Sequence, residues 1–319
     1  MLQGCTAWVL DSVNCAPMNA PHASPADSAA KSSAKSPGNS PAAPPDVSPG
    51  AGISLVDIGL NLGHDSFDED RAAVVARAQA AGVTRMVITG ASLPGTERAL
   101  EVVRQWPETM RCTAGIHPHH ATDLFEPGAE ERLRALIQQP EIVAGGECGL
   151  DFFRNFSPQP IQIAAFEKQL EVCAEYQLPV FLHQRDAHPD FLKVLDRWLP
   201  QLPRAVVHCF TGTGEELQDY LDRDLYVGIT GWICDERRGH HLRELVGRIP
   251  LHRLMLETDA PYLLPRDLPK TRLRHSGDRR NEPAYLPHIL ATVAHYRGES
   301  PETTAAGTTA AAQNFFGWP

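Results

Sequence analysis

The sequence predicts an α/β fold, a single TIM (β/α)₈-type barrel. Eight short apolar runs rich in β-branched residues alternate with longer segments of helical period, and this alternation is typical of a parallel barrel. The chain has 319 residues, enough for a barrel of about 250 residues and an extension. An open doubly wound sheet is the structural alternative, but no G-x-G-x-x-G follows the first run, which disfavours its dinucleotide-binding form.

The first part of the chain differs in composition from the rest. Residues 1–51 are rich in Ala, Pro and Ser, and no hydrophobic period runs from Pro21 to Gly52. Such a segment buries too little apolar surface to offset its ordering entropy. We therefore expect a disordered tail over residues 1–51, for which Met18 offers an alternative start, and a barrel domain over residues 52–319.

Strands are expected where apolar and β-branched residues run together between turn residues. These runs are Leu55–Gly59, Arg85–Gly90, Arg111–Ile116, Ile142–Glu147, Val180–His183, Ala205–Phe210, Leu225–Thr230 and Leu254–Thr258. Helices are expected where apolar residues recur every three or four positions. These segments are Asp68–Ala81, Gln159–Tyr176, Asp190–Leu199, Glu215–Leu221 and Pro301–Phe316. Gly82 ends the first helix and Pro179 precedes the fifth strand, as helix-stop residues do.

Composition and charge disfavour some classes of protein. The net charge is −10, which argues against a protein that coats nucleic acid with a basic face but allows an enzyme that grips one end of a strand. The seven cysteines include no C-x-x-C pair, so we expect free thiols in a reducing compartment, the cytoplasm. No apolar run reaches the ~18 residues of a membrane-spanning helix, so no membrane contact is expected.

Candidate metal ligands stand at the ends of four predicted strands. Glu147 ends the fourth, His183 the fifth, His208 lies near the end of the sixth, and Asp259 follows the eighth. The carboxyl ends of barrel strands gather at one face, where active sites form. Burying such groups unpaired costs several kcal/mol, which a shared cation removes. The set suits Mg²⁺, Mn²⁺ or Zn²⁺, whereas hydrogen-bonded scaffolding is the alternative for each residue alone.

Residues beside these ligands are candidates for catalysis. Glu257 and Asp259 are two apart, so they face the same side of a strand. One could hold the metal while the other orients a ligand or a water, and either could accept a proton from an attacking water. His117 follows the third strand and would reach the mouth of the barrel, where it could touch a phosphate or a water. The chemistry predicted is metal-assisted hydrolysis.

One basic segment follows the eighth strand, at the face expected to hold the metal. Residues 266–280 contain six Lys or Arg against two Asp. Arg side chains bind phosphate oxygens bidentately, so Arg279 and Arg280, joined by Arg154 and Arg185 from other strand ends, could bind a phosphodiester backbone. A solvated loop is the alternative. The nearby rings Phe152, Phe153 and Phe156 could stack on bases, although core packing is the role we expect for them.

Four motifs resemble those of the TatD family of metal-dependent DNases. They are Gly146–Asp151, Pro179–His188, His208–Gly212 and Glu257–Leu263. Two further stretches, Gly228–Gly239 and Arg279–Pro283, point to one branch of that family. The resemblance implies a Mg²⁺-dependent 3′–5′ exonuclease on a metallo-dependent hydrolase barrel, with Mn²⁺ or Zn²⁺ as alternative ions. Its substrate would be DNA, single-stranded or at 3′ ends, with RNA as a second candidate, in cytoplasmic DNA repair and turnover.

The resemblance also implies roles for single residues. By motif, Glu147, His183 and His208 would be metal ligands. Asp259 would be a ligand or the general base, and His117 would lie near the scissile phosphate.

One feature departs from the wider family. Most members carry His-x-His after the first strand, and here Gly59 and Asn61 stand in those places. We therefore expect one firmly held ion, with a second ion weak or bound only with substrate. His64 lies three residues further on and is not expected to substitute.

Two other functions remain open from the sequence. The same ligands would serve a metal-dependent amidohydrolase or a small phosphoester hydrolase, although the basic segment favours a polyanionic substrate. A non-catalytic role beside a protein-export system is the second alternative, and no partner helix supports it. We expect a monomer.

Overall fold

The computed structural model describes residues 53–273 and 278–318. The expected disordered tail over residues 1–51 lies outside the described residues, as does Arg274 of the basic segment. Within the described part, no helix is both long enough and apolar enough to cross a bilayer.

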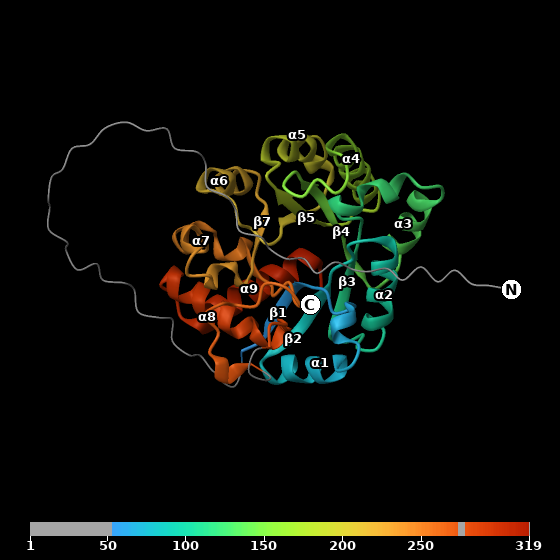
Figure 1. Cartoon of the computed structure of the whole chain (residues 1–319). Helices are drawn as coiled ribbons and strands as arrows, with labels where there is room; N and C mark the ends of the chain where they lie inside the picture. The colour runs from blue at the N-terminus through green and yellow to red at the C-terminus, as the bar shows by residue number, and fades with distance from the viewer. Residues whose placement is uncertain (1–52, 274–277, 319) are drawn as a thin grey trace, which may run out of the picture. The chain divides into compact units, whose positions relative to one another are not determined.

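Eight parallel strands form one sheet in the order in which they occur along the chain (Figure 1). They are β1 Leu55–Leu60, β2 Val83–Ile88, β3 Met110–Ala114, β4 Ile142–Asp151, β5 Val180–Arg185, β6 Ala205–Val207, β7 Tyr226–Ile229 and β8 Leu254–Leu256. The segment after β8 joins the end of β1: the Asp259 N–H donates to the Gly59 carbonyl over 2.8 Å, and the Asn61 N–H donates to the Ala260 carbonyl over 2.6 Å. The predicted (β/α)₈ barrel is thus confirmed.

Helices surround the strands in Figure 1. Their bounds are α1 Arg71–Ala80, α2 Leu93–Val103, α3 Ala129–Ile137, α4 Gln159–Glu175, α5 His188–Trp198, α6 Gly214–Asp222, α7 His240–Leu245, α8 Leu286–Arg297 and α9 Pro301–Phe316. The sequence predicted α1, α4, α5, α6 and α9. It missed α2, α3, α7 and α8. In α2, Pro94 and Gly95 stand in the first turn behind a Ser92 cap, and α8 is buried on several sides and so lacks an amphipathic period.

The last three strands are shorter than expected. The prediction extended these strands over further residues, which lie outside the strands in the structure, such as Cys209–Phe210 and Glu257–Thr258. Cys209 and Asp259 instead adopt left-handed backbone conformations, with φ of 46° and 55°. Such conformations cost about 1–3 kcal/mol for a non-glycine residue and gather at functional sites.

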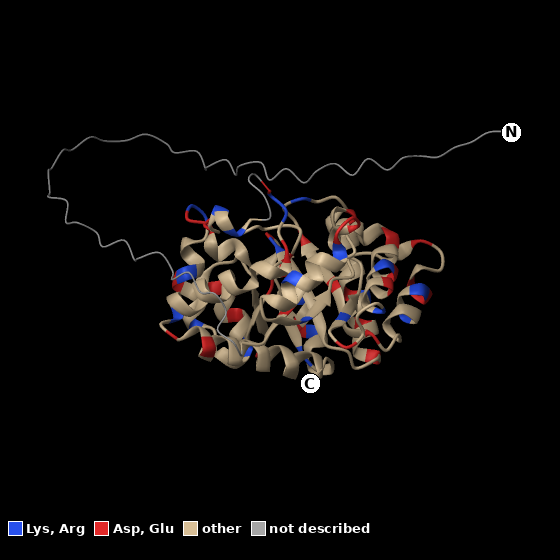
Figure 2. Ribbon diagram, turned by 90° about the horizontal axis from the view of Figure 1, so that it is seen from below, with Lys and Arg blue, Asp and Glu red and all other residues tan. Residues whose placement is uncertain are grey.

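The end of α9 closes the barrel at the amino-terminal ends of its strands. Residues pointing into the barrel, such as Val56 of β1 and Tyr226 of β7, form one buried cluster with Phe315 and Trp318. The rings of Tyr226 and Phe315 lie 5.1 Å apart. In Figure 2 the C-terminus lies at the lower edge of the barrel, whereas Lys and Arg residues stand at the upper edge. The carboxyl ends of the strands are therefore the end left for a site.

Replacing Phe315 by Ala should open a cavity at this closed end of the barrel and lower the free energy of unfolding by about 3–5 kcal/mol, the usual cost of removing a buried ring. Urea unfolding followed by circular dichroism measures the change. The matched control is Phe125→Ala, because Phe125 is 52% exposed and should change stability by no more than about 0.5 kcal/mol. Equal stabilities for the two variants would contradict the burial of Phe315 at the closed end of the barrel.

Candidate metal centre

The Glu147 carboxylate is the point at which side chains from several strands meet. Glu147 lies in β4, and its Oε1 is 2.9 Å from His183 Nδ1 of β5. The same oxygen is 2.7 Å from His208 Nε2, just after β6, and 3.4 Å from His117 Nε2, after β3. Ligand atoms of His117, Glu147 and His183 all lie within 4.8 Å of one another. Three imidazoles therefore converge on one buried carboxylate oxygen, as a shared cation requires.

Asp151 supports the cluster from the last position of β4. Its Oδ2 is 2.8 Å from His119 Nε2, and its Oδ1 accepts hydrogen bonds from the Phe153 and Arg154 N–H groups. These bonds hold the pKa of Asp151 below its usual range although burial opposes them. The sequence analysis missed Asp151 and His119 as site residues. The strand period was an available signal, because residues 147, 149 and 151 share one side of β4.

Glu257 contacts the ring nitrogen of His208 that faces away from Glu147. It is fully buried, its Oε2 is 3.2 Å from His208 Nδ1, and its Oε1 accepts the Cys209 N–H over 2.5 Å. The carboxylate fills the space between Gly59 and Gly228, because a Cβ on either glycine would lie 2.5 Å from one of its oxygens. This contact directs His208 Nε2 toward Glu147. The geometry suits the orienting role expected for Glu257 and leaves it no access to a water.

Asp259 approaches the cluster from the segment after β8. Its Oδ1 accepts a 3.2 Å hydrogen bond from Asn61 Nδ2. Burial and the neighbouring charges of Glu147 and Glu257 raise the pKa of Asp259 to about 8, against the opposing effect of His208. The group of ligand atoms that lie within 4.8 Å of one another contains neither Asp259 nor His208, although His208 contacts Glu147 directly. Asp259 is therefore a near neighbour of the candidate ligands, and burial and like charges favour its protonated form.

The electrostatics of the cluster favour a cation. Burial and the nearby His183 lower the pKa of His117 to about 4. The pKa of Glu147 lies well below its usual range despite burial, because His208 and His117 face it, and the pKa of His208 is raised by Glu147 and Glu257. Protons on imidazoles thus balance the buried carboxylates, a role that a divalent ion can take over.

The donor set also fits a divalent ion. It offers carboxylate oxygens and imidazole nitrogens, which together suit Mn²⁺, Zn²⁺ or Mg²⁺. His183 Nε2 is buried without a hydrogen bond, 3.5 Å from Asp151 Oδ2. A buried ring nitrogen without a partner is costly unless it binds something. The residues present therefore fit a metal centre at the carboxyl ends of β4–β6.

Arg280 does not fit the substrate-binding role expected from the sequence. Its Nη1 and Nη2 are each 2.8 Å from an Asp70 carboxylate oxygen, and its guanidinium lies 4.6 Å from the centre of the Phe67 ring. The Arg280 side chain is only 12% exposed. These contacts tie the basic segment to the start of α1, whereas the neighbouring Arg279 is exposed.

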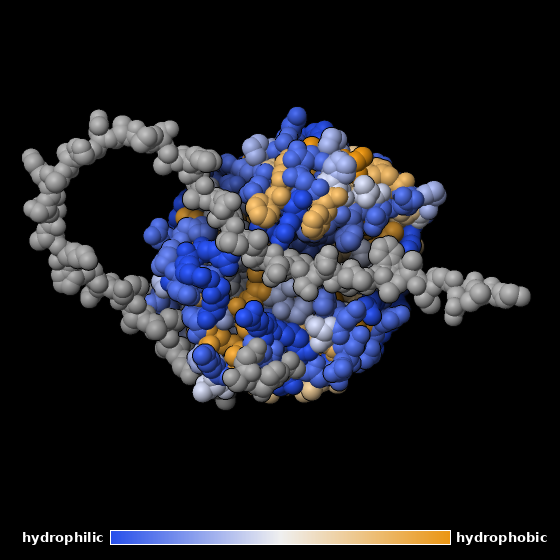
Figure 3. Space-filling view, viewed as in Figure 1, coloured by the Kyte–Doolittle hydropathy of each residue, from blue (hydrophilic) through white to orange (hydrophobic). Residues whose placement is uncertain are grey.

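Arg154 and Arg185 lie together with an exposed ring. The Arg185 guanidinium is 4.0 Å from the centre of the Phe153 ring, and that of Arg154 is 5.7 Å from it. Phe152 packs against the core as expected, but Phe153 and Phe156 are exposed, contrary to the core packing predicted for all three. Figure 3 shows hydrophobic side chains standing among hydrophilic ones over the region of α4 and β5.

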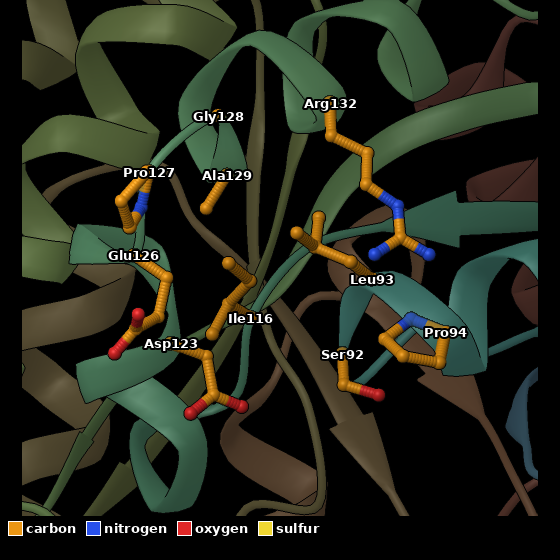
Figure 4. Close-up of a pocket in the computed structure, with 10 residues that line it drawn as sticks. All are labelled: Ser92, Leu93, Pro94, Ile116, Asp123, Glu126, Pro127, Gly128, Ala129 and Arg132. Atoms are coloured by element: carbon orange, nitrogen blue, oxygen red, sulfur yellow. The ribbon is translucent and has the colours of Figure 1, made fainter.

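Two other features lie away from this cluster. A pocket between the start of α2 and the start of α3 contains Asp123, Glu126 and Arg132 (Figure 4) and none of the expected site residues. A group formed by Cys234, Asp267 and His288 could also gather around an ion. There, His288 Nε2 lies 2.6 Å from an Asp267 oxygen, so the group already ties the loop after β8 to α8 without one.

Comparison with known proteins settles the family. The family model described as "TatD related DNase" matches residues 56–317. The chain belongs to the TatD related DNase family. The 3′-5′ ssDNA/RNA exonuclease TatD of Citrobacter rodentium (strain ICC168) is 53% identical over 264 residues, which cover 82% of this chain and 98% of that protein. The protein of the same name from Salmonella typhimurium is 53% identical over 263 residues, with the same coverage. The resemblance seen in the motifs is confirmed.

Solved structures of TatD proteins share the fold. A TatD family hydrolase from Entamoeba histolytica superposes with a TM-score of 0.75 at 25% identity, covering 83% of this chain and 98% of that one. The TatD homologue YJJV of Escherichia coli gives a TM-score of 0.74 at 25% identity with the same coverage. The barrel of this chain is thus the barrel of TatD proteins.

Gly228→Ala should weaken metal binding about 10–100-fold, the usual cost of disturbing a residue that supports a ligand. The added Cβ would lie 2.5 Å from Glu257 Oε1 and 3.2 Å from His208 Cα, so Glu257 must leave His208. Calorimetric titration with Mn²⁺ measures the affinity. Gly63→Ala is the matched control, since its Cβ meets only ordinary contacts, the nearest at 3.6 Å. Unchanged Mn²⁺ affinity in folded Gly228→Ala would argue against this support.

Proposed function

We propose that the protein is a divalent-metal-dependent 3′–5′ exonuclease that hydrolyses phosphodiester bonds of single-stranded DNA, with RNA as a second substrate. The observation that carries the proposal is the convergence of three imidazoles on Glu147 Oε1 at the carboxyl ends of the strands. Two relatives that are 53% identical are 3′-5′ ssDNA/RNA exonucleases by name, which supports the polarity and the substrate. The exposed Arg279 and the half-buried Arg154 and Arg185 offer charge for a phosphodiester chain.

Glu147, His183 and His208 would hold the ion. A bound divalent cation polarises a phosphoryl oxygen and lowers the pKa of a coordinated water. Glu257 acts by holding the imidazole of His208 in place, as supporting carboxylates do in metal sites. Asp259, held by Asn61, is the candidate acceptor for the proton of the attacking water. Burial and like charges raise its pKa, and a bound cation would offset those charges and leave the carboxylate ionised to act as a base. His117, neutral above its lowered pKa of about 4, can contact the phosphate or the water.

Mg²⁺ is the ion we propose, with Mn²⁺ or Zn²⁺ as alternatives that the imidazole ligands also suit. The proposal includes one firmly held ion. The two positions at which the family resemblance would place histidine ligands have other contacts: Gly59 borders the Glu257 carboxylate, and Asn61 binds Asp259. A metal-dependent amidohydrolase or small phosphoester hydrolase is the alternative, and the arginines beside an exposed ring favour a nucleic acid over a small neutral substrate.

We also propose that the enzyme works in the cytoplasm, in DNA repair and turnover. The described cysteines Cys112, Cys148, Cys173, Cys209 and Cys234 are all free thiols, which is usual in a reducing compartment. A monomer remains our expectation, and sedimentation equilibrium would test it.

Glu147→Gln and His208→Ala should each lower exonuclease activity by orders of magnitude, because each removes an atom on which the ion depends. A single-stranded oligonucleotide labelled at its 5′ end, incubated with Mg²⁺, should give the wild-type enzyme a descending ladder of products. Chelation with EDTA should abolish the ladder, and Mg²⁺ should restore it.

The control variant is His120→Ala, because His120 is exposed and lies in the same loop as His117. It should retain wild-type turnover. Circular dichroism must show that all variants fold. Wild-type activity in either Glu147→Gln or His208→Ala would refute the metal centre, and cleavage of small esters without cleavage of oligonucleotides would favour the alternative hydrolase.

A further inference from the structure

Aromatic side chains are exposed around the mouth of the barrel. The large hydrophobic residues exposed in the described part of the chain are Phe125, Phe153, Phe156 and Tyr262. Phe153 and Phe156 lie in the loop after β4, and Tyr262 lies in the loop after β8. Single exposed rings are common on protein surfaces, but two of these rings closely follow Asp151 and the third closely follows Asp259.

Short chains of contacts connect these rings to the metal centre. The Phe156 ring is 4.7 Å from the His119 ring in an edge-on arrangement, and the His119 ring is 4.2 Å from that of His117. His117 in turn lies 3.4 Å from the Glu147 carboxylate. Tyr262 donates its N–H to the Asp259 carbonyl over 2.9 Å. The Phe156 ring is thus connected to the centre through His119 and His117, whereas Tyr262 is connected to Asp259 through the backbone.

Positive charge accompanies the rings of the β4 loop. The Arg185 guanidinium stacks on Phe153 at 4.0 Å, with Arg154 at 5.7 Å from the same ring. In contrast, the fourth exposed ring, Phe125, is close in sequence to the acidic Asp123 and Glu126. A ring beside guanidinium groups suits a ligand with both a flat π-face and a phosphate, which is a nucleotide.

We propose that Phe153 and Phe156, with Arg185 and Arg154, form a stacking platform for the unpaired nucleobases next to the scissile phosphate, and that Tyr262 contacts the strand across the mouth. This proposal rests on the exonuclease function proposed above and adds the means of selecting single strands. In a duplex the two faces of each base are covered by its neighbours and its edge is paired, so the platform binds only bases that have left the stack. The arginines contact the adjoining phosphates.

Binding of oligonucleotides to enzyme kept in Ca²⁺ or EDTA tests the platform apart from catalysis. Fluorescence anisotropy with a labelled single-stranded thymidine oligonucleotide gives the Kd. Phe156→Leu and Phe153→Leu should each weaken binding by about 5- to 150-fold, the effect of one lost base–ring stack. Phe156→Trp should keep at least the wild-type affinity, because Trp offers a larger π-face than Phe. Phe125→Leu, an equally exposed ring without the arginines, should bind as the wild type does.

An abasic oligonucleotide of the same length separates stacking from charge. Wild-type enzyme and Phe156→Leu should bind it with equal affinity, whereas Arg185→Gln should weaken binding of both oligonucleotides. The same Leu variants should keep wild-type Mn²⁺ affinity, which shows that the metal centre is undisturbed.

Two results would overturn the platform. One is unchanged thymidine oligonucleotide binding in the Phe153→Leu/Phe156→Leu double variant, in which case the rings serve another contact. The other is an equal loss of affinity for the abasic oligonucleotide. If wild-type enzyme cleaves oligonucleotides while either result holds, the exonuclease function stands and only the platform fails. If wild-type enzyme neither binds nor cleaves them, both proposals fail.

Discussion

The Glu147 carboxylate is a buried charge, and much of the site is built to compensate it. An isolated carboxylate buried in a protein loses its hydration at a cost of several kcal/mol. Here three imidazoles contact one of its oxygens, Asp151 faces the outer nitrogen of His183, and Glu257 faces the outer nitrogen of His208. His183 and His208 thus each lie between two carboxylates, whereas His117 Nδ1 accepts the His119 N–H. Charges alternate through the cluster, so the rings keep their orientation and aim their nitrogens at the place where a cation would bind.

The fold restricts this cluster to one end of the barrel. Phe315 and Trp318 fill the other end together with residues that point into the barrel. The converging side chains come from or just after β3, β4, β5 and β6, which are neighbours in the sheet, so adjacent strand ends bring them together without long loops. The left-handed backbone of Cys209 turns its N–H to the Glu257 carboxylate. Strain at these strand ends is therefore coupled to the alignment of His208.

The strands and the convergence of Glu147, His183 and His208 at one end of the barrel could be predicted from the sequence because both depend on local patterns. Buried parallel strands are continuous apolar runs, and a charged residue that ends such a run must lie at the barrel mouth. Helix α8 was not predictable in this way because most of its surface is buried. The ion pair of Arg280 with Asp70 could not be predicted from a local pattern either, because the two residues are 210 positions apart. Likewise, the exposure of Phe153 and Phe156 depends on the path of a loop that no periodicity describes.

Gly59 in the first strand and Asn61 just after it both lie against carboxylates of the site. Gly59 presents no side chain, and the Glu257 carboxylate lies where its Cβ would point. Asn61 donates to Asp259 over 3.2 Å instead of offering a ring nitrogen. An amide N–H₂ group donates hydrogen bonds and is no metal ligand, so β1 now positions two carboxylates of the site. Glu257 orients His208, and Asp259 stands beside the candidate ligands. The first strand and the residue after it therefore support the cluster around Glu147 without offering a ring nitrogen to it.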